Sequence, residues 1–307
     1  MEPKKKFHFI GIGGSLMHNV AIALQQLGHI ISGSDDEIVD PSRSKLLTSN
    51  LLPEKAGWFP ERIDKSIDIV IFGRHTMKDN PELVKAQQLG LKVYTVPEYI
   101  YEFALNKQRV VVVGSDGRNV VASMIVHVLK ALHRPVDYLI SHGNDYLMRL
   151  SDAPVIVIDG SESPSTTLYH TPQFIKYKQH IGVFTDIAWN PETTNFNEND
   201  FIRQYDLFAD TTPKGGMLIF NESDKLASVI CNKERPDVQY FPYKAHASTS
   251  ETGKDYLVNS HKERVPVHLS GKQNFLYYNA TFEALKKIGV TPEQFYQTIS
   301  SFKGALD

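Results

Sequence analysis

The sequence predicts an α/β protein made of two parallel-sheet domains. Short apolar runs alternate with helical patterns, and glycine-rich turns follow two of the apolar runs. A length of 307 residues suits two domains, because a domain commonly has about 100–200 residues. A polar segment, 106–109, separates two series of strands. We therefore expect domains at residues 1–106 and 107–302 and a short stub at 303–307.

Four strands are expected in the first domain, at residues 7–12, 29–32, 67–72 and 92–96, with helices between them. Asn80 or Asp79 is expected to cap a helix with Pro81 in its first turn and Glu82 beside the positive end of the helix dipole. Helix chemistry alone explains this segment. Alternation of strands and helices produces βαβ units, so the sheet should be parallel and covered on both faces.

The second domain begins with the purest strand pattern of the chain, 110–113. A helix is expected after it, because apolar residues recur at helical spacing at Val120, Val121, Met124, Ile125, Val128, Leu129 and Leu132. Further strands are expected at 155–158, 181–185, 217–220 and 238–241, and a hairpin at 256–258 and 265–269. Thr291, Pro292 and Glu293 predict the start of the last helix.

Composition excludes several classes of protein. Hydrophobic residues are 41% and charged residues 22% of the chain, which is typical of globular proteins. The 33 basic and 35 acidic residues leave a net charge of -2, which gives no basic footprint for nucleic acid. Cys231 is the one cysteine, so we expect a reducing, cytoplasmic location and a buried thiol. No apolar run approaches the ~20 residues that span a membrane.

The first glycine loop directly follows the first strand and contains Gly11, Gly13, Gly14 and Ser15. In this place, free N–H groups and the helix dipole favour a phosphate. Leu16 stands where the dinucleotide fingerprint has its last glycine, which weakens a standard NAD site. Asp35 or Asp36 closes the second strand, where an acid can accept a hydrogen bond from a ribose hydroxyl. We expect a pyrophosphate-bearing nucleotide here; the alternative is a glycine-rich turn without a ligand.

The second glycine loop is Gly114-Ser115-Asp116-Gly117-Arg118-Asn119, and it joins a strand to a helix as a P-loop does. A working P-loop needs a lysine for the terminal phosphates and a Ser or Thr hydroxyl for magnesium. Arg118 and Asn119 replace these groups. Asp116 is expected to cap the helix and to place its own charge where a phosphate would bind. We therefore expect this loop to be degenerate and to bind Mg-ATP weakly or not at all.

Other side chains have two open interpretations each. His75 follows a strand at the sheet edge where ligands of such folds bind, and it faces either substrate or solvent. His18 either contacts a diphosphate or lies on an exposed helix face. Asp159 and Glu162 form either a weak cation site or a solvated loop. A core role is favoured over nucleotide stacking for the aromatic run Phe275, Tyr277, Tyr278 and Phe282, and His127 and His133 are interpreted as structural.

Further motifs accompany the two loops: Met17, Gly33-Ser34-Asp35, residues 79–83 and 97–99, Ser123-Met124 and residues 301–304. With them, the chain from residue 7 to about 304 resembles the Mur ligases of bacterial cell-wall synthesis, most closely the murein peptide ligase and UDP-N-acetylmuramate–alanine ligase types. The resemblance implies a P-loop-like central domain, which in the family uses Mg-ATP to form an acyl phosphate that an amine attacks. It also implies a Rossmann-like first domain that binds a UDP-N-acetylmuramate-type sugar through Gly11, Gly13, Gly14, Ser15 and Asp35. Met17, His18 and His75 are further candidates for the same site.

Departures from the family pattern fall at its ATP and magnesium positions. Gly117-Arg118-Asn119 stands for Gly-Lys-Thr, and Asp159-Gly160-Ser161-Glu162 keeps only two carboxylates of an acidic strand end. Asn190-Pro191 replaces an Asp-His pair, and residues 271–274 lack the family's histidine. The family's third domain is not expected within the chain. All of these losses affect the ATP-dependent reaction of the family, because the missing groups bind phosphate, bind the metal or close the protein over ATP.

The leading hypothesis is a Mur-ligase-like protein that binds a UDP-sugar, has little or no ATPase activity, and acts in muropeptide metabolism by binding or regulation, through a protein partner. The rival hypothesis is an active ATP-dependent ligase that joins an amino acid or tripeptide to UDP-N-acetylmuramate, with this chain a truncated form. A third class, a nicotinamide-dependent oxidoreductase, is disfavoured by Leu16.

Overall fold

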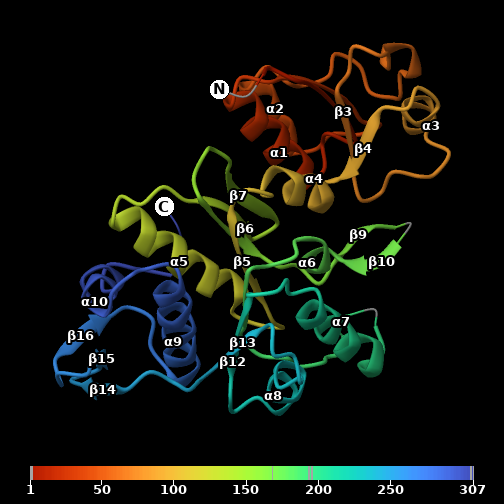
Figure 1. Ribbon diagram of the computed structural model, residues 1–307. Coiled ribbons are helices and arrows are strands. Elements are labelled where there is room, and N and C mark those ends of the chain that lie inside the picture. The colour runs from red at the N-terminus through yellow and green to blue at the C-terminus, as the bar shows by residue number, and fades with distance from the viewer. Residues whose placement is uncertain (1–2, 168, 193, 195, 305, 307) are drawn as a thin grey trace. The chain divides into compact units, whose positions relative to one another are not determined.

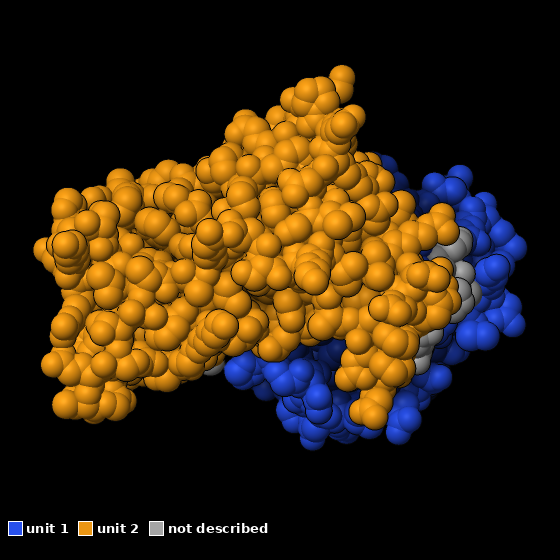
Figure 2. Space-filling model, turned by 90° about the horizontal axis from the view of Figure 1, so that it is seen from below, with its two compact units in different colours: residues 1–105, 141–152, 162–177 blue, residues 106–140, 153–161, 178–307 orange. Residues whose placement is uncertain are grey.

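The computed structural model describes residues 3–167, 169–192, 194, 196–304 and 306 (Figure 1). Two compact units are distinguished in Figure 2. Unit 1 comprises residues 1–105, 141–152 and 162–177, and unit 2 comprises residues 106–140, 153–161 and 178–307. The chain thus leaves unit 1 after residue 105 and returns to it twice. Within the expected stub, residues 305 and 307 lie outside the described residues.

Unit 1 contains a four-stranded parallel sheet in the order β2-β1-β3-β4, which confirms the α/β class (Figure 1). The strands are β1 (Lys6–Ile10), β2 (Ile30–Ser34), β3 (Ile69–Phe72) and β4 (Lys92–Thr95). Buried apolar side chains fill β1 and β3, including Phe9, Ile10 and Ile71. The principal helices are α1 (Ser15–Gln26), α2 (Ser42–Thr48), α3 (Pro81–Gln88) and α4 (Val96–Phe103), and a 3-10 turn lies at Pro60–Arg62.

Residues at the start of α3 cap the helix and also bind residues outside it, so helix capping alone does not explain this segment. Asn80 is the N-cap, because its side chain accepts hydrogen bonds from the N–H groups of Glu82 and Leu83. The Glu82 side chain is fully buried and accepts hydrogen bonds from the N–H of Phe59 and the Ser34 hydroxyl, and it lies 3.3 Å from His8 Nε2. Burial opposes ionisation, but these partners outweigh it and lower the pKa of Glu82. Glu82 therefore ties α3 to β1 and β2, which the sequence interpretation missed.

Unit 2 is built on a parallel sheet whose strands follow the order β13-β12-β11-β5-β8-β6 (Figure 1). The expected strands are found as β5 (Gln108–Val113), β8 (Val155–Asp159), β11 (Ile181–Phe184), β12 (Met217–Asn221) and β13 (Gln239–Tyr243). β6 (Asp137–His142) and β7 (Asp145–Arg149) were not expected. β5 is central to the sheet, as its wholly apolar run predicts.

The remaining elements include the expected hairpin and last helix. The hairpin is β15 (Lys254–Val258) with β16 (Arg264–Val267), and β14 (Ser248–Glu251) adds a third strand. The helices of unit 2 are α5 (Arg118–Ala131), α7 (Glu198–Asp210), α8 (Lys225–Cys231), α9 (Lys272–Lys287) and α10 (Pro292–Ile299). Within unit 1, β9 (Pro164–Thr166) pairs with β10 (Tyr169–Pro172) before α6 (Gln173–Lys176). Cys231 is buried as expected. Among the described residues, no helix has the length and apolar character needed to cross a membrane.

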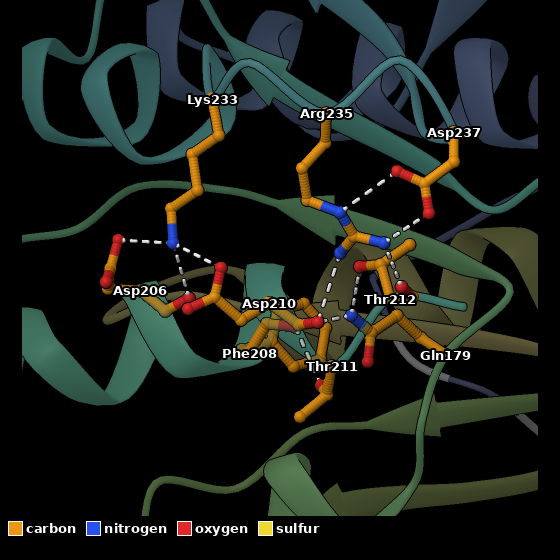
Figure 3. Close-up of polar contacts among 9 residues, drawn as sticks. All are labelled: Gln179, Asp206, Phe208, Asp210, Thr211, Thr212, Lys233, Arg235 and Asp237. Carbon is orange, nitrogen blue, oxygen red and sulfur yellow. Dashed lines mark hydrogen bonds and ion pairs between the residues drawn. The ribbon is translucent and has the colours of Figure 1, made fainter. Parts of the chain in front are cut away.

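Cationic and amide side chains cover the C-terminal end of α7 (Figure 3). Arg235 donates hydrogen bonds to the carbonyl oxygens of Asp210 and Thr212, and Gln179 donates to that of Phe208. Lys233 pairs with the Asp206 and Asp210 carboxylates at 2.7 and 2.6 Å. The last carbonyl groups of a helix have no intrahelical partner and carry the negative end of its dipole, so donors and cations stabilise them.

Arg235→Met is therefore expected to lower the free energy of unfolding by about 1–2 kcal/mol, because the end of α7 loses two charge-assisted hydrogen bonds. Urea unfolding monitored by circular dichroism measures the change. Arg203→Met is the control, because Arg203 is exposed on the same helix. It should change stability by less than about 0.5 kcal/mol. Equal effects of the two substitutions would contradict this role of Arg235.

Candidate functional site

A cavity of about 810 Å³ in unit 1 brings together most of the residues expected to bind a ligand. It lies at the carboxyl ends of the parallel strands, where ligands of open α/β sheets bind. Its volume falls in the range of about 300–1,000 Å³ that is usual for small-molecule sites. The expected residues that line it are Gly11, Gly13, Gly14, Ser15, Met17, Asp35 and His75.

The first glycine loop is held in place from the end of β2. The N–H groups of Gly11 and Ile12 donate to the carbonyl oxygen of Ser34, and the N–H of Gly13 donates to Asp35 Oδ2 at 2.7 Å. A Cβ atom on Gly13 would lie 2.9 Å from Asp35 Oδ2, so this contact requires glycine. The Asp35 carboxylate therefore supports the loop through one oxygen, in addition to lining the cavity.

The N-terminus of α1 is available to an anion. Its N-cap is Gly14, which has no side chain to cap the first N–H groups, and the first turn contains no acidic residue. Ser15 and Leu16 of this turn line the cavity. The uncompensated positive end of the helix dipole thus faces the space in which a ligand would lie.

Asp35 titrates in the range where enzymes are usually assayed. Burial raises the pKa of Asp35 to about 6, although the hydrogen bond from Gly13 opposes the shift. Its neighbour Asp36 contributes in the same direction as burial. Ionisation of Asp35 is therefore less favourable in the folded protein than in the unfolded chain.

Asp35→Asn is expected to stabilise the protein relative to wild type at pH 7.5 and to have little effect at pH 4. The folded-state pKa lies above the ordinary value of 3.8, so the stability that Asp35 contributes is complete below about pH 4 and is lost as the pH rises through 6. Asparagine keeps the oxygen that accepts from Gly13. Urea unfolding at pH 4, 5, 6 and 7.5 measures the difference between the two proteins. A difference that stays constant over this range would contradict the expected titration.

His18 is the exception among the expected residues, because it lies neither in the cavity nor on an exposed face. Its side chain is fully buried, and its Nδ1 lies 2.9 Å from the carbonyl oxygen of Gly14. Its Nε2 lies 3.4 Å from the Asp145 carboxylate, and burial lowers the pKa of His18. His18 thus holds the first turn of α1 through the carbonyl group of Gly14, and its burial shows that the exposed-face interpretation was wrong.

Several residues that line the cavity were missed by the sequence interpretation. Arg74 and Trp58 come from loops without a recognisable motif. Tyr146, Ser163, Ser165 and Gln173 come from the two segments that return to unit 1, and the sequence interpretation had placed these segments in the second domain. Residues with no local signature could be found only through the three-dimensional structure.

The second glycine loop lies in unit 2, and hydrogen bonds from neighbouring residues of the protein hold Asp116 in this loop. Asp116 Oδ1 accepts from the N–H of Gly117, and Asp116 Oδ2 accepts from the Tyr277 hydroxyl at 3.0 Å. The N–H of Asp116 donates to Asp186, and the Thr185 hydroxyl donates to the carbonyl oxygen of Asp116. The Asp116 carboxylate therefore lies just before the N-terminus of α5. The expectation that Asp116 caps this helix is wrong, because the N-cap is Gly117 and Asp116 accepts only from the N–H of Gly117 at this end of the helix.

Arg118 is engaged by the acidic residue that was a candidate for cation binding. Its Nε lies 2.7 Å from Asp159 Oδ1, and Asp159 is buried at the end of β8. Arg118 also donates to the carbonyl oxygen of Gly114, across the loop. An arginine of the protein thus neutralises the carboxylate that would otherwise be free for a metal ion.

The ring of Tyr277, from α9, packs against Gly117 of the second glycine loop. Gly117 has a left-handed φ of +72°, and a Cβ atom there would overlap the ring of Tyr277. Phe275, Tyr277 and Tyr278 are buried, so the expected core role of this aromatic run is confirmed for these three residues. Tyr277 also has a second role, because its hydroxyl contacts the loop. Burial, together with the Asp116 carboxylate, raises the pKa of Tyr277, which keeps the hydroxyl as a donor.

The residues of this loop do not fit a magnesium nucleotide. Asp116 places negative charge at the helix N-terminus, Arg118 is paired with Asp159, and Asn119 offers an amide that accepts from the N–H of Val120. Glu162 belongs to unit 1, whereas Asp159 belongs to unit 2. No group of three His, Cys, Asp or Glu side chains suited to a metal ion occurs in the described ranges.

Comparison with known proteins agrees with the motifs. The family model "Mur ligase family, catalytic domain" matches residues 6–108. The chain is 28% identical to a UDP-N-acetylmuramate–L-alanine ligase of Caldicellulosiruptor saccharolyticus, over 98% of this chain and 67% of the relative. The chain therefore spans about two thirds of that relative's length.

Solved structures share the fold. A ligase of Neisseria meningitidis that links UDP-N-acetylmuramate to L-alanyl-γ-D-glutamyl-meso-diaminopimelate superposes with a TM-score of 0.83 at 20% identity, over 99% of this chain and 100% of that chain. The UDP-N-acetylmuramate–alanine ligase of Thermotoga maritima superposes with a TM-score of 0.69 at 18% identity, over 98% of this chain and 69% of that chain. The resemblance inferred from the motifs is thus confirmed: this chain is similar to Mur ligases in sequence and in fold.

Proposed function

We propose that unit 1 binds a UDP-N-acetylmuramate-type nucleotide sugar and that the chain does not carry out ATP-driven ligation at an ordinary rate. The cavity supports the first part, because seven expected residues from three separate segments of the chain line it at one edge of the sheet. Relatives of the chain are ligases of UDP-N-acetylmuramate by name, which supports this class of ligand.

The second part of the proposal rests on the chemistry of the second glycine loop. Transfer of a phosphoryl group requires cations placed around the triphosphate, and each such electrostatic group is worth about 100- to 1,000-fold in rate. Here Arg118 is paired with Asp159, and Asp116 adds a negative charge. The active-ligase hypothesis would require these pairs to open and a metal to bind elsewhere.

The role that follows is binding or regulation in cell-wall metabolism. A chain that holds a cell-wall precursor without consuming it can report its abundance to another protein. A protein partner and a cytoplasmic location are part of this proposal.

Thermal and urea unfolding of the full chain test the proposal. UDP-N-acetylmuramate at about 100 times its Kd should add about 2.7 kcal/mol to the free energy of unfolding, whereas NADH should add nothing. Absence of stabilisation by the sugar nucleotide at millimolar concentration would overturn the proposed ligand. Release of ADP from ATP in the presence of the tripeptide would favour the rival, an active ligase.

Ser15→Glu separates loss of ligand binding from loss of folding. An acidic residue in the first turn of α1 should stabilise the helix through its dipole and repel a diphosphate at the same place. We therefore expect this variant to be as stable as wild type and to lose the stabilisation by ligand. Gln26→Glu is the matched control, because it adds the same charge at the other end of α1. It should keep the stabilisation by ligand.

A further inference from the structure

We infer that Arg74 is the residue that binds the diphosphate of the ligand and so determines the preference of the cavity for phosphorylated compounds. This inference rests on the proposed function and adds to it a specific residue that the sequence motifs do not indicate. Arg74 is exposed, lies directly after β3, and lines the cavity.

The backbone around Arg74 is fixed on both sides. The N–H of Gly73 donates to the carbonyl oxygen of Ile10 at 2.8 Å, and the N–H of Thr76 donates to that of Gly73. The carbonyl oxygen of Arg74 itself accepts from the N–H of Thr167 at 2.9 Å. The side chain therefore extends from a defined position of the backbone beside the cavity.

This position is next to the first glycine loop. β3 pairs with β1 in the sheet, and a Cβ atom on Gly11 would lie 3.8 Å from the Cα of Gly73. Arg74 thus begins one residue away from the loop that leads to the N-terminus of α1. A diphosphate at that N-terminus would lie within reach of a side chain as long as arginine.

The guanidinium of Arg74 is available for a ligand. Within the described part of the chain, no carboxylate lies within ion-pair distance of it, although the cavity is lined by acidic residues: Asp35, Asp36, Glu37 and Asp79. These acids would repel a diphosphate. Among the described residues that line the cavity, Arg74 is the only Lys or Arg. Its planar fork suits two phosphate oxygens at once, which a single ammonium group does not match.

Isothermal titration of the full chain with UDP, UDP-N-acetylmuramate and UDP-N-acetylglucosamine tests this assignment. Arg74→Met should weaken binding of all three at least about tenfold, because a charge-assisted bidentate contact is lost. Arg74→Lys should fall between Arg74→Met and wild type. Arg43→Met is the matched control, because Arg43 is exposed in the same unit and lies outside the cavity lining. It should bind all three as wild type does.

The outcomes separate this inference from the proposed function. Unchanged affinity of Arg74→Met would overturn the role of Arg74 alone. Loss of affinity only for UDP-N-acetylmuramate would also overturn it, because Arg74 would then bind the carboxylate that UDP-N-acetylglucosamine lacks. Binding of UDP that depends on Arg74, without binding of UDP-N-acetylmuramate, would support Arg74 and overturn the proposed ligand. Failure of wild type to bind any of the three would overturn both.

Discussion

Arg118→Met is expected to lower the free energy of unfolding by about 2–3 kcal/mol. Asp159 is 1% exposed, and the substitution removes the cation that lies 2.7 Å from its carboxylate. Breaking a buried ion pair from one side commonly costs about 3–5 kcal/mol, and the effect here should be smaller because Arg118 is 25% exposed. Because Arg118 is the cation that neutralises the buried Asp159 carboxylate, the stability of the fold should depend on Arg118.

A double-mutant cycle in urea measures this dependence. Arg118→Met combined with Asp159→Asn should recover at least half of the loss, because the uncompensated charge is then absent. Arg264→Met is the control, since it breaks an ion pair with Glu251 in which both side chains are more than half exposed. That change should cost less than about 1 kcal/mol. A similar cost for both pairs would show that Asp159 does not need Arg118.

Gly117→Ala is expected to lower the free energy of unfolding by about 3 kcal/mol or more. The substitution combines a left-handed backbone with overlap between the new methyl group and the ring of Tyr277. The backbone part costs about 1 kcal/mol, and overpacking of a filled site costs about 1–3 kcal/mol more. The size of the loss thus reports whether Tyr277 fills the loop.

Gly253→Ala isolates the backbone part of this cost. Gly253 has a φ of +76°, close to that of Gly117, but a Cβ atom there would meet nothing within 4 Å. We expect it to cost only about 1 kcal/mol. Calorimetric melting of both variants provides the comparison. Equal losses would mean that the ring of Tyr277 moves away from the loop at little cost.

Local patterns predicted the elements that position both glycine loops. Apolar runs located every strand of the first sheet, and the glycines at 11–14 and 114–117 marked the turns between strand and helix. β6 and β7 were missed because they begin or end at the polar residues Asp137, His142 and Asp145, which leaves only short apolar runs between them. Short strands at the edge of a sheet bury too little to carry a clear periodic signal.

Contacts between distant residues could not be read from the sequence. The place of Asp116 next to α5 was predictable from the chain order, but its expected capping contact is not formed, because Gly117 is the N-cap. The pairing of Arg118 with Asp159 and the packing of Tyr277 on Gly117 depend on the order of strands in the sheet and on the placement of α9. The burial of His18 could not be predicted, because its partner Asp145 lies 127 residues away in the sequence.

Isothermal titration of the full chain with Mg-ATP, at saturating UDP-N-acetylmuramate, tests most directly whether the second glycine loop is closed by the protein's own side chains. We expect no saturable binding up to about 1 mM, the upper end of usual substrate KM values. Saturable binding at micromolar concentration that is lost in Arg118→Met would contradict it, because a triphosphate would then bind where Asp116, Asp159 and Tyr277 now hold the loop.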